Sequence, residues 1–263
     1  MDSADQNLKL SAKNRIIYCF KVEIAGKKIE IECFYKYVFQ QCRNYLTRFK
    51  TPDFTICTSI DDIELEIRNI PSVNARGLGY DNRVSVDYVG AESSVIHRKL
   101  ANLMLNYRIV LIHGAAIAVH DKCYIFTAPS GTGKTTHINN WVEMIPDTIV
   151  VNGDKPLIDV DNKLVYGTPW CGKEGMNTNV AVPLAGIIAL ERGEINQINK
   201  IEFKEIVPTL IRQCYIPKDK ELSIKALKLI GELSGVPCYK FYCNMDRESA
   251  IVAYEGLNNE QIY

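Results

Sequence analysis

The sequence predicts an α/β (α+β) protein, in which a domain with a mixed sheet and flanking helices follows a smaller β-rich N-terminal region. Three observations lead to this fold class. The first third reads mainly as strands, short buried strands alternate with helices after residue 109, and a glycine-rich segment separates one such strand from a helix. We place the boundary between residues 1–92 and 93–263.

The composition indicates a globular protein and excludes some classes of partner. Of 263 residues, 47% are apolar and 24% charged, which is ordinary for a soluble domain. Lys plus Arg number 31 and Asp plus Glu 31, so the chain lacks the basic excess typical of nucleic-acid binding. No apolar run approaches the roughly 18 residues that span a bilayer, and residues 1–14 are polar. We therefore expect a cytoplasmic protein with no nucleic-acid or membrane partner.

The nine cysteines predict reduced thiols rather than a disulfide framework or a zinc site. Their number is odd, their positions are scattered, and no C-x-x-C spacing occurs. No histidine stands at ligand spacing beside a cysteine. We expect most of them to serve as small apolar core residues.

The N-terminal region reads as mostly extended. The pattern predicts strands over 15–24 and 28–34, separated by a turn at Gly26. Residues 35–49 fit either a strand or a short helix. Further segments predicted to be extended are 54–58, 62–68 and 84–89.

The second region begins with a helix and then alternates strands with helices. Ser93-Ser94 resembles a helix start, and residues 95–107 carry apolar side chains at helical spacing. The strands predicted after it are 109–112, 115–119, 123–127, 148–151, 156–160, 163–167, 184–191 and 237–244. The helices predicted are 135–144, 203–214, 219–234 and 247–256.

The glycine-rich segment has the pattern of a phosphate-binding loop. Residues 128–135 match G-x-x-x-x-G-K-[ST], except that Ala128 replaces the first glycine. We expect the main chain around Gly131 and Gly133 to curve around a phosphate, Lys134 to reach the β- and γ-phosphates, and Thr135 to bind Mg²⁺. The whole predicted nucleotide site is Ser130, Gly131, Thr132, Gly133, Lys134, Thr135 and Thr136.

Two further residues are candidates for chemistry at this loop. If strands 113–119 and 123–127 pair around a turn near Asp121, His113 lies opposite residues 128–130. Asp154 follows a buried strand, and ligands of α/β sheets bind beyond the carboxyl ends of strands. The alternatives are a histidine that ends a strand without a chemical role and an aspartate that only forms a turn.

Together these residues resemble the HPr kinase/phosphorylase and phosphoenolpyruvate carboxykinase superfamily. The loop 130–136 is similar to the carboxykinase form, and the order from His113-Gly114 through the loop to Asp154 is similar to the C-terminal catalytic domain of HPr kinase. The resemblance covers roughly residues 95–190 and implies a P-loop kinase that uses ATP and Mg²⁺. It implies His113, Lys134 and Asp154 as catalytic residues and Thr135 and Asp154 as metal ligands.

The chain departs from this family after Asp154. HPr kinases have an Asp-Asp pair, of which one acid is the base and the other supports the metal; here Asp154 stands alone, with Asp159 either a second carboxylate or a strand-end residue. Residues 166–175 replace the family's signature segment. We interpret Trp170, Lys173 and Glu174 there as acceptor or phosphate recognition, or alternatively as a hairpin turn pinned by the tryptophan.

The predicted function is phosphoryl transfer from ATP to a hydroxyl, of a serine in a peptide or protein or of a small molecule. Arg192, after the strand 184–191, either reaches a phosphate or lies on the surface. The alternatives are an NTPase switch, a carboxykinase-like enzyme on a small metabolite, and a regulatory nucleotide-binding protein without kinase activity. The sequence does not identify the acceptor, and it does not distinguish among ATP, GTP and pyrophosphate as the donor. It also leaves the oligomeric state open, with a homo-oligomer among the alternatives.

Overall fold

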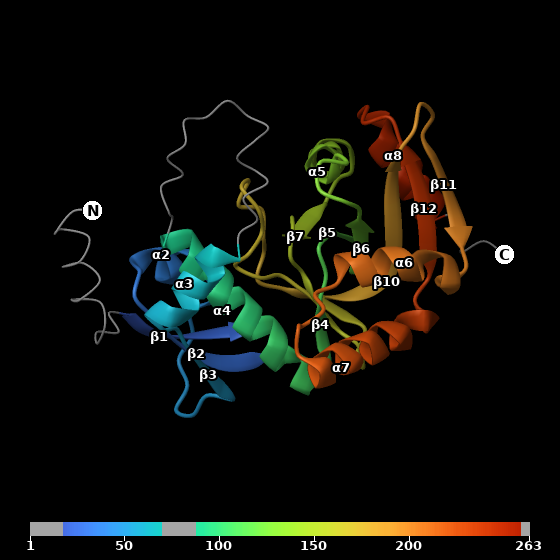
Figure 1. Ribbon diagram of the computed structural model, residues 1–263. Helices are drawn as coiled ribbons and strands as arrows, with labels where there is room; N and C mark the ends of the chain where they lie inside the picture. The colour runs from blue at the N-terminus through green and yellow to red at the C-terminus, as the bar shows by residue number, and fades with distance from the viewer. Residues whose placement is uncertain (1–17, 70–87, 259–263) are drawn as a thin grey trace. The chain divides into compact units, whose positions relative to one another are not determined.

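The computed structural model describes residues 18–69 and 88–258, and its helices and mixed sheets confirm the α/β class. The chain divides into two compact units, Met1–Leu100 and Ala101–Tyr263 (Figure 1). This division falls within helix α4 (Tyr88–Met104), whereas we placed the boundary at residues 92 and 93 from the sequence. Among the described residues, no helix has both the length and the apolar character needed to cross a bilayer.

The first unit contains a three-stranded sheet. Strands β1 (Tyr18–Ile24) and β2 (Lys27–Cys33) form the predicted antiparallel hairpin, and β3 (Phe54–Cys57) pairs in parallel with β2. The turn residues Ala25 and Gly26 both have positive φ, 51° and 69°, as a two-residue hairpin turn requires. The start of the predicted strand 15–24, residues 15–17, lies outside the described residues.

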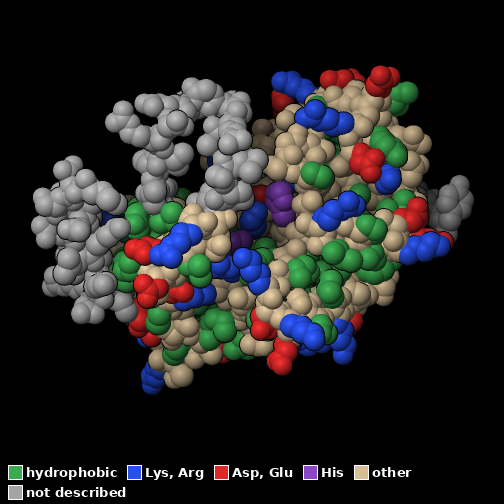
Figure 2. Space-filling model, viewed as in Figure 1, with side chains coloured by type: hydrophobic (Ala, Val, Ile, Leu, Met, Phe, Trp, Pro, Cys, Tyr) green, Lys and Arg blue, Asp and Glu red, His purple; other side chains and the backbone are tan. Residues whose placement is uncertain are grey.

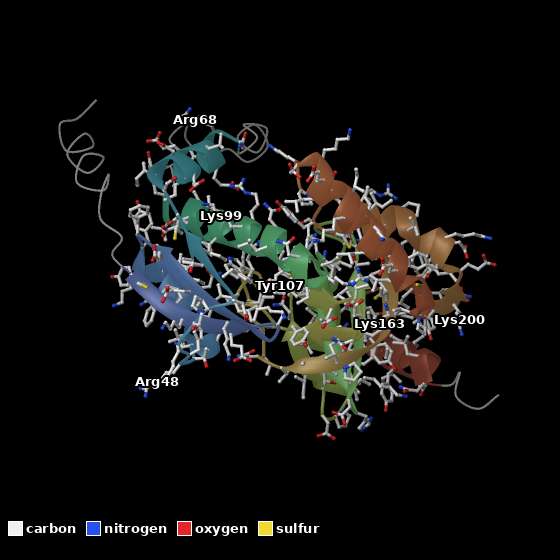
Figure 3. All side chains as sticks on the ribbon, turned by 90° about the horizontal axis from the view of Figure 1, so that it is seen from below. Arg48, Arg68, Lys99, Tyr107, Lys163 and Lys200 are labelled. Carbon is white, nitrogen blue, oxygen red and sulfur yellow. The ribbon has the colours of Figure 1, made fainter. Side chains whose placement is uncertain are left out.

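The segment 62–68 is helical, so the prediction of an extended segment there was wrong. Helix α3 (Ile60–Arg68) begins with a capping box, in which the Ser59 hydroxyl accepts from the Asp62 amide and the Asp62 carboxylate accepts from the Ser59 amide. Lys99, labelled in Figure 3, donates from α4 to the same carboxylate at 2.8 Å. The alternating apolar residues of this segment are typical of a strand, but the capping box at its start favours a helix.

Two other predictions in the first unit are settled by helices. Residues 35–49 form helix α2 (Lys36–Gln41) and the 3₁₀ turn η1 (Arg43–Tyr45), so the helical alternative is the one observed. Ser93, the predicted helix start, lies in the interior of helix α4, which already includes Tyr88. The predicted strand 84–89 is therefore wrong at residues 88–89, and residues 84–87 lie outside the described part of the chain.

The second unit is built on a mixed sheet with strand order β11-β12-β10-β6-β5-β7. The first residues of β10 also pair with a smaller antiparallel group, β4-β8-β9. The bounds are β4 (Ile109–Leu111), β5 (Ala115–Val119), β6 (Lys122–Thr127), β7 (Ile149–Asn152), β8 (Leu157–Asp159), β9 (Leu164–Tyr166), β10 (Ala181–Arg192), β11 (Gln197–Ile201) and β12 (Cys238–Cys243). The sequence predicted every one of these strands except β11.

Helices cover both faces of this sheet, which buries its central strands on both sides (Figure 1). Side chains of α5 and α8 pack on one face, and side chains of α6 and α7 pack on the other. The helix bounds are α5 (Lys134–Met144), α6 (Phe203–Gln213), α7 (Lys220–Gly231) and α8 (Glu248–Asn258), with 3₁₀ turns η3 (Leu105–Tyr107) and η4 (Glu232–Gly235). This double burial explains why the strands read as continuous apolar runs.

Strand direction determines where a site can form in the second unit. Strands β6, β10 and β12 are mutually parallel, and β7 runs the same way because both β6 and β7 are antiparallel to β5. Their carboxyl ends therefore meet at one edge of the sheet, together with the start of β5. Charged side chains of both signs are spread over the face of the molecule seen in Figure 2, in keeping with the balanced composition.

Candidate functional site

The glycine-rich loop, residues 128–133, connects the end of β6 to the start of α5 at this sheet edge. Gly131 and Gly133 have φ values of 79° and 119°, which L side chains rarely adopt. Ala128 is buried and is not among the described residues with positive φ, so the loop does not need glycine there. The first turn of α5 follows the loop directly, so the free amide groups of this helix end point toward the loop.

Lys134 is the first residue of α5, and its side chain folds back over the loop. Its Nζ donates to the carbonyl oxygens of Ala128, at 2.8 Å, and Pro129, at 3.3 Å. Burial lowers the pKa of Lys134, and the negative charge of Asp154 partly offsets this effect. The ammonium group is thus held at the loop by neutral carbonyl groups, which leaves its positive charge to be compensated by an anion.

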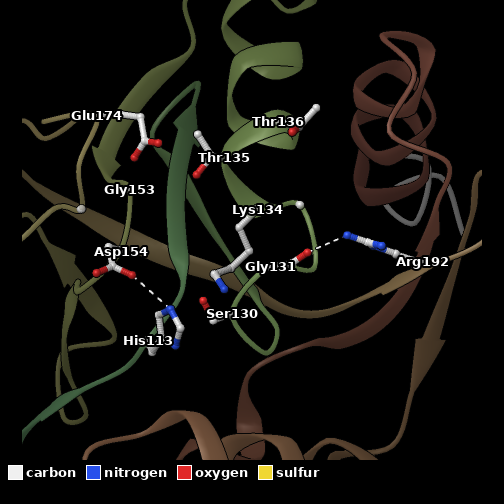
Figure 4. A pocket seen from close by; sticks show the side chains of 12 residues that line it. His113, Ser130, Gly131, Lys134, Thr135, Thr136, Gly153, Asp154, Glu174 and Arg192 are labelled. Atoms are coloured by element: carbon white, nitrogen blue, oxygen red, sulfur yellow. Dashed lines mark hydrogen bonds and ion pairs between the residues drawn. The ribbon is translucent and has the colours of Figure 1, made fainter. Parts of the chain in front are cut away.

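His113 lies where the hairpin argument predicted. Strands β5 and β6 pair antiparallel around the turn at His120 and Asp121, so the start of β5 reaches the residues after β6. The Thr127 hydroxyl donates to the His113 carbonyl at 2.9 Å. The His113 Nε2 lies 3.0 Å from Oδ1 of Asp154, as Figure 4 shows.

Asp154 follows β7, in a turn that Asn152 stabilises. The Asn152 Oδ1 accepts from the amides of Asp154 and Lys155, at 2.8 and 2.6 Å, and the Gly114 amide donates to the Asp154 carbonyl. Burial raises the pKa of the Asp154 carboxyl, but the hydrogen bond from His113 and the charge of Lys155 outweigh it and lower the pKa to about 2. Asp154 therefore carries a negative charge throughout the neutral pH range. It also forms part of the turn after β7.

One cavity of about 370 Å³ brings the predicted residues together. Its lining is His113, Ser130, Gly131, Gly133, Lys134, Thr135, Thr136, Gly153, Asp154, Gly172, Glu174 and Arg192. Thr132 is the one member of the predicted loop set that does not line it, and its hydroxyl donates to the Pro129 carbonyl at 2.9 Å. In the view of Figure 4, Thr135 lies toward Asp154 and Glu174.

Glu174 supplies a second carboxylate to the cavity. A Cβ built on Gly172 would lie 3.4 Å from the Asp154 Cβ and 3.5 Å from the Glu174 Oε2, so both acidic side chains approach Gly172. Gly172 itself has a φ of 83°. The segment around it was expected near the strand ends; Glu174 lines the cavity, whereas Trp170 is buried and Lys173 is exposed, and neither lines the cavity.

The alternative second acid, Asp159, has a structural role. It ends β8, and its Oδ1 accepts from the amides of Asp161 and Asn162 in the turn between β8 and β9, both at 3.0 Å. It does not line the cavity. No sequence pattern pairs Glu174 with Asp154, since the local signal is only an acidic residue between Gly172 and Gly175.

Arg192 is the last residue of β10 and, in the view of Figure 4, lies on the side of the glycine-rich loop away from Lys134. Its guanidinium donates to the carbonyl oxygens of Gly131, at 2.7 Å, and Thr132, at 3.3 Å. Arg192 is exposed and also lines the cavity, so it combines features of both sequence interpretations.

The cavity thus has a cationic wall and an acidic wall. Lys134, Arg192 and the helix start favour an anion, while Asp154 and Glu174 offer hard oxygen ligands on the side of Gly172. Such an arrangement suits a polyphosphate with a divalent cation. Comparison of the chain with protein-family models and with curated proteins found no match. The family resemblance therefore rests on the residues themselves.

Proposed function

We propose that this chain is an ATP-dependent kinase that transfers a phosphoryl group to a hydroxyl, in the manner of HPr-kinase-like P-loop enzymes. One observation carries the proposal. Lys134 and the glycine-rich loop lie in the same cavity as Asp154, whose carboxylate contacts His113. The acceptor class is a serine of a peptide or protein, or a small-molecule hydroxyl, and the expected location is the cytoplasm.

The phosphate side of the proposal uses the main chain and one ammonium group. The amides around Gly131–Thr135 and the start of α5 would bind the β- and γ-phosphates. Lys134 would exchange the two carbonyl oxygens that it now contacts for phosphate oxygens, which compensate its charge better. Positioning and charge stabilisation would then supply most of the catalysis, as phosphoryl transfer needs little covalent chemistry from the protein.

The metal side of the proposal uses oxygen ligands only. The Thr135 hydroxyl and the carboxylates of Asp154 and Glu174 are the ligand type that Mg²⁺ prefers, so the residues fit this ion. Bound there, Mg²⁺ would neutralise charge on the transferred group. His113 would hold one Asp154 oxygen in place, and the other oxygen, which lies 3.2 Å from the Lys155 Nζ, would contact the metal or the acceptor hydroxyl.

The low pKa of Asp154 bears on its role. A carboxylate with a pKa of about 2 is a weak proton acceptor at neutral pH. We propose that Asp154 acts mainly by its fixed negative charge, on the metal and on the orientation of the hydroxyl, and takes up the proton only late in the transfer.

The experiment is incubation with γ-labelled ATP, Mg²⁺ and candidate acceptors, including cell extracts and peptides from neighbouring genes. Label transfer should occur and should be lost in Lys134→Ala and Asp154→Asn. Lys163→Ala is the matched control, because the Lys163 ammonium (Figure 3) also donates to two carbonyls, of Val160 and Glu232, outside the cavity. Transfer that persists in both site variants would exclude the proposed site.

Three other functions would use the same cavity. Phosphate release without any labelled acceptor would favour an NTPase switch. Nucleotide binding without turnover would favour a regulatory protein. Transfer of label to a small carboxylated metabolite would favour a carboxykinase-like enzyme.

A further inference from the structure

Strands β10 and β12 end side by side next to the glycine-rich loop. A side chain at the end of β10 and another just after β12 contact this loop. Arg192 at the end of β10 is paired in register with Cys243 at the end of β12, and the Gly193 amide donates to the Cys243 carbonyl at 3.1 Å. Met245 follows two residues after this pair. Both side chains contact the glycine-rich loop between Gly131 and Gly133.

Arg192 fixes the orientation of two peptide groups in the loop. It donates to the carbonyl oxygens of Gly131 and Thr132, and Figure 4 draws Gly131 between Arg192 and Lys134. In a trans peptide the carbonyl and the following N–H point in opposite directions. A carbonyl of Thr132 held toward Arg192 therefore turns the Gly133 N–H the other way, toward the side of Lys134.

Met245 fills the space beside Gly133. Its Sδ and Cε each lie 2.5 Å from the position that a Cβ on Gly133 would take. Met245 has a φ of 71°, an unfavourable conformation for a residue with a side chain, so its surroundings must hold it there. Asn140 of α5 does so by donating to the carbonyls of Met245, at 3.1 Å, and Asp246, at 3.0 Å, and the Met245 amide donates to the Cys243 Sγ.

We propose that Arg192 and Met245 are positioning residues that hold the glycine-rich loop, residues 128–133, in its anion-binding conformation. Arg192 acts from the side opposite Lys134 in Figure 4, and Met245 acts beside Gly133. The inference rests on the proposed nucleotide binding at this loop. Arg192 then acts on peptide groups that bind the β-phosphate, so its loss weakens ADP and ATP alike. An arginine that contacts the γ-phosphate instead would discriminate between the two nucleotides.

The test measures affinity for Mg·ADP and Mg·ATP by calorimetry in Arg192→Ala and Met245→Ala. We expect each variant to bind both nucleotides about tenfold more weakly, by the same factor, as for the loss of one charge-assisted hydrogen bond or one packing contact. Arg192→Lys should recover part of the loss, because its ammonium can still donate to a loop carbonyl. The melting temperature without nucleotide checks that each variant is folded.

Matched controls separate positioning from general damage. Arg212→Ala removes an exposed arginine that donates to the Pro208 carbonyl on α6, and Met144→Ala removes a half-buried methionine at the end of α5. Neither should change nucleotide affinity. Unchanged affinity in Arg192→Ala and Met245→Ala, or a loss confined to ATP, would overturn the inference while leaving the kinase proposal intact.

Hydrogen exchange gives a readout that does not depend on nucleotide. In the nucleotide-free protein, both variants should speed amide exchange at residues 130–135, and the two controls should not. Equal exchange in wild type and both variants would also refute the positioning role. If wild type binds neither nucleotide, the proposed function fails, and this exchange comparison still decides whether Arg192 and Met245 hold the loop.

Discussion

The Nε2 atom of His113 lies 3.0 Å from Oδ1 of Asp154, which joins the start of β5 to the segment after β7. Oδ2 of the same carboxylate lies 3.2 Å from the Lys155 Nζ. Both oxygens of Asp154 therefore face a positively charged or hydrogen-bonding group, at the carboxyl edge of the sheet. This contact gives the cavity a carboxylate whose position and charge are both fixed.

The ionisation of Asp154 should make stability depend on pH. Its folded pKa of about 2 is below the unfolded value of about 3.9, so its contribution is fully present above pH 4 and is lost as pH falls toward 2. We expect Asp154→Asn to cost up to about 2 kcal/mol at pH 6 and less at pH 3. Urea unfolding of both proteins across this range measures the difference, and a cost that grows on acidification would contradict the assignment.

Loss of the His113 contact should slow transfer more than it weakens nucleotide binding. His113→Ala leaves Asp154 without its hydrogen bond, and an orienting partner of this kind is worth about 10- to 100-fold in activity. We expect kcat to fall by that factor and KM for ATP to change less. His120→Asn, at an exposed turn position with a φ of 49°, is the control, since asparagine tolerates this conformation. A fall in kcat as large in His120→Asn would argue against a specific role of His113.

The two loop glycines should differ in their response to substitution. Gly131→Ala meets only the strain of its φ, about 1–2 kcal/mol, because no atom of the described residues, apart from Gly131 and its chain neighbours, lies within 4 Å of the added Cβ. Gly133→Ala adds a clash with Met245 and should destabilise more. Gly231→Ala in α7, where φ is −60° and space is open, should be neutral or stabilise by up to about 1 kcal/mol. Chemical denaturation ranks the three, and the reverse order for the loop pair would contradict the geometry.

Restoring the consensus glycine at position 128 should not improve the site. Ala128 is 1% exposed, packs in the core below the loop and lacks a positive φ. We expect Ala128→Gly to lower the free energy of unfolding by about 1 kcal/mol, through a lost buried methyl and a more flexible unfolded chain. Calorimetric affinity for Mg·ADP should stay at the wild-type value; a clear gain would mean that the Ala128 side chain crowds the loop.

The two candidate second acids should separate in their metal dependence. Glu174→Gln should raise the Mg²⁺ concentration for half-maximal transfer about tenfold, since it removes a carboxylate from the cavity. Asp159→Asn should leave it unchanged, because Asp159 lies in the β8–β9 turn and asparagine can still accept the turn hydrogen bonds. Titration of Mg²⁺ at saturating ATP distinguishes them, and equal responses would remove Glu174 from the metal site.

Local sequence patterns were sufficient to predict an element where its own apolar residues show which type of secondary structure it forms. The strands and helices of the second unit were predicted because buried strands and amphipathic helices have different apolar periods. Local patterns were misleading at residues 62–68, where the alternation of apolar residues indicates a strand although Ser59 caps a helix. They also missed β11, whose residues are largely polar and exposed because it is paired only with β12.

The glycine-rich loop, its lysine and the position of His113 beside it could all be predicted from the sequence, because they follow from short-range geometry and from counting residues around one hairpin turn. The approach of Glu174 to Asp154 and the contacts of Arg192 and Met245 with the loop became visible only in the folded protein. These contacts join segments from different strands and loops. Their meeting depends on the order and direction of strands in the sheet, which no local pattern encodes.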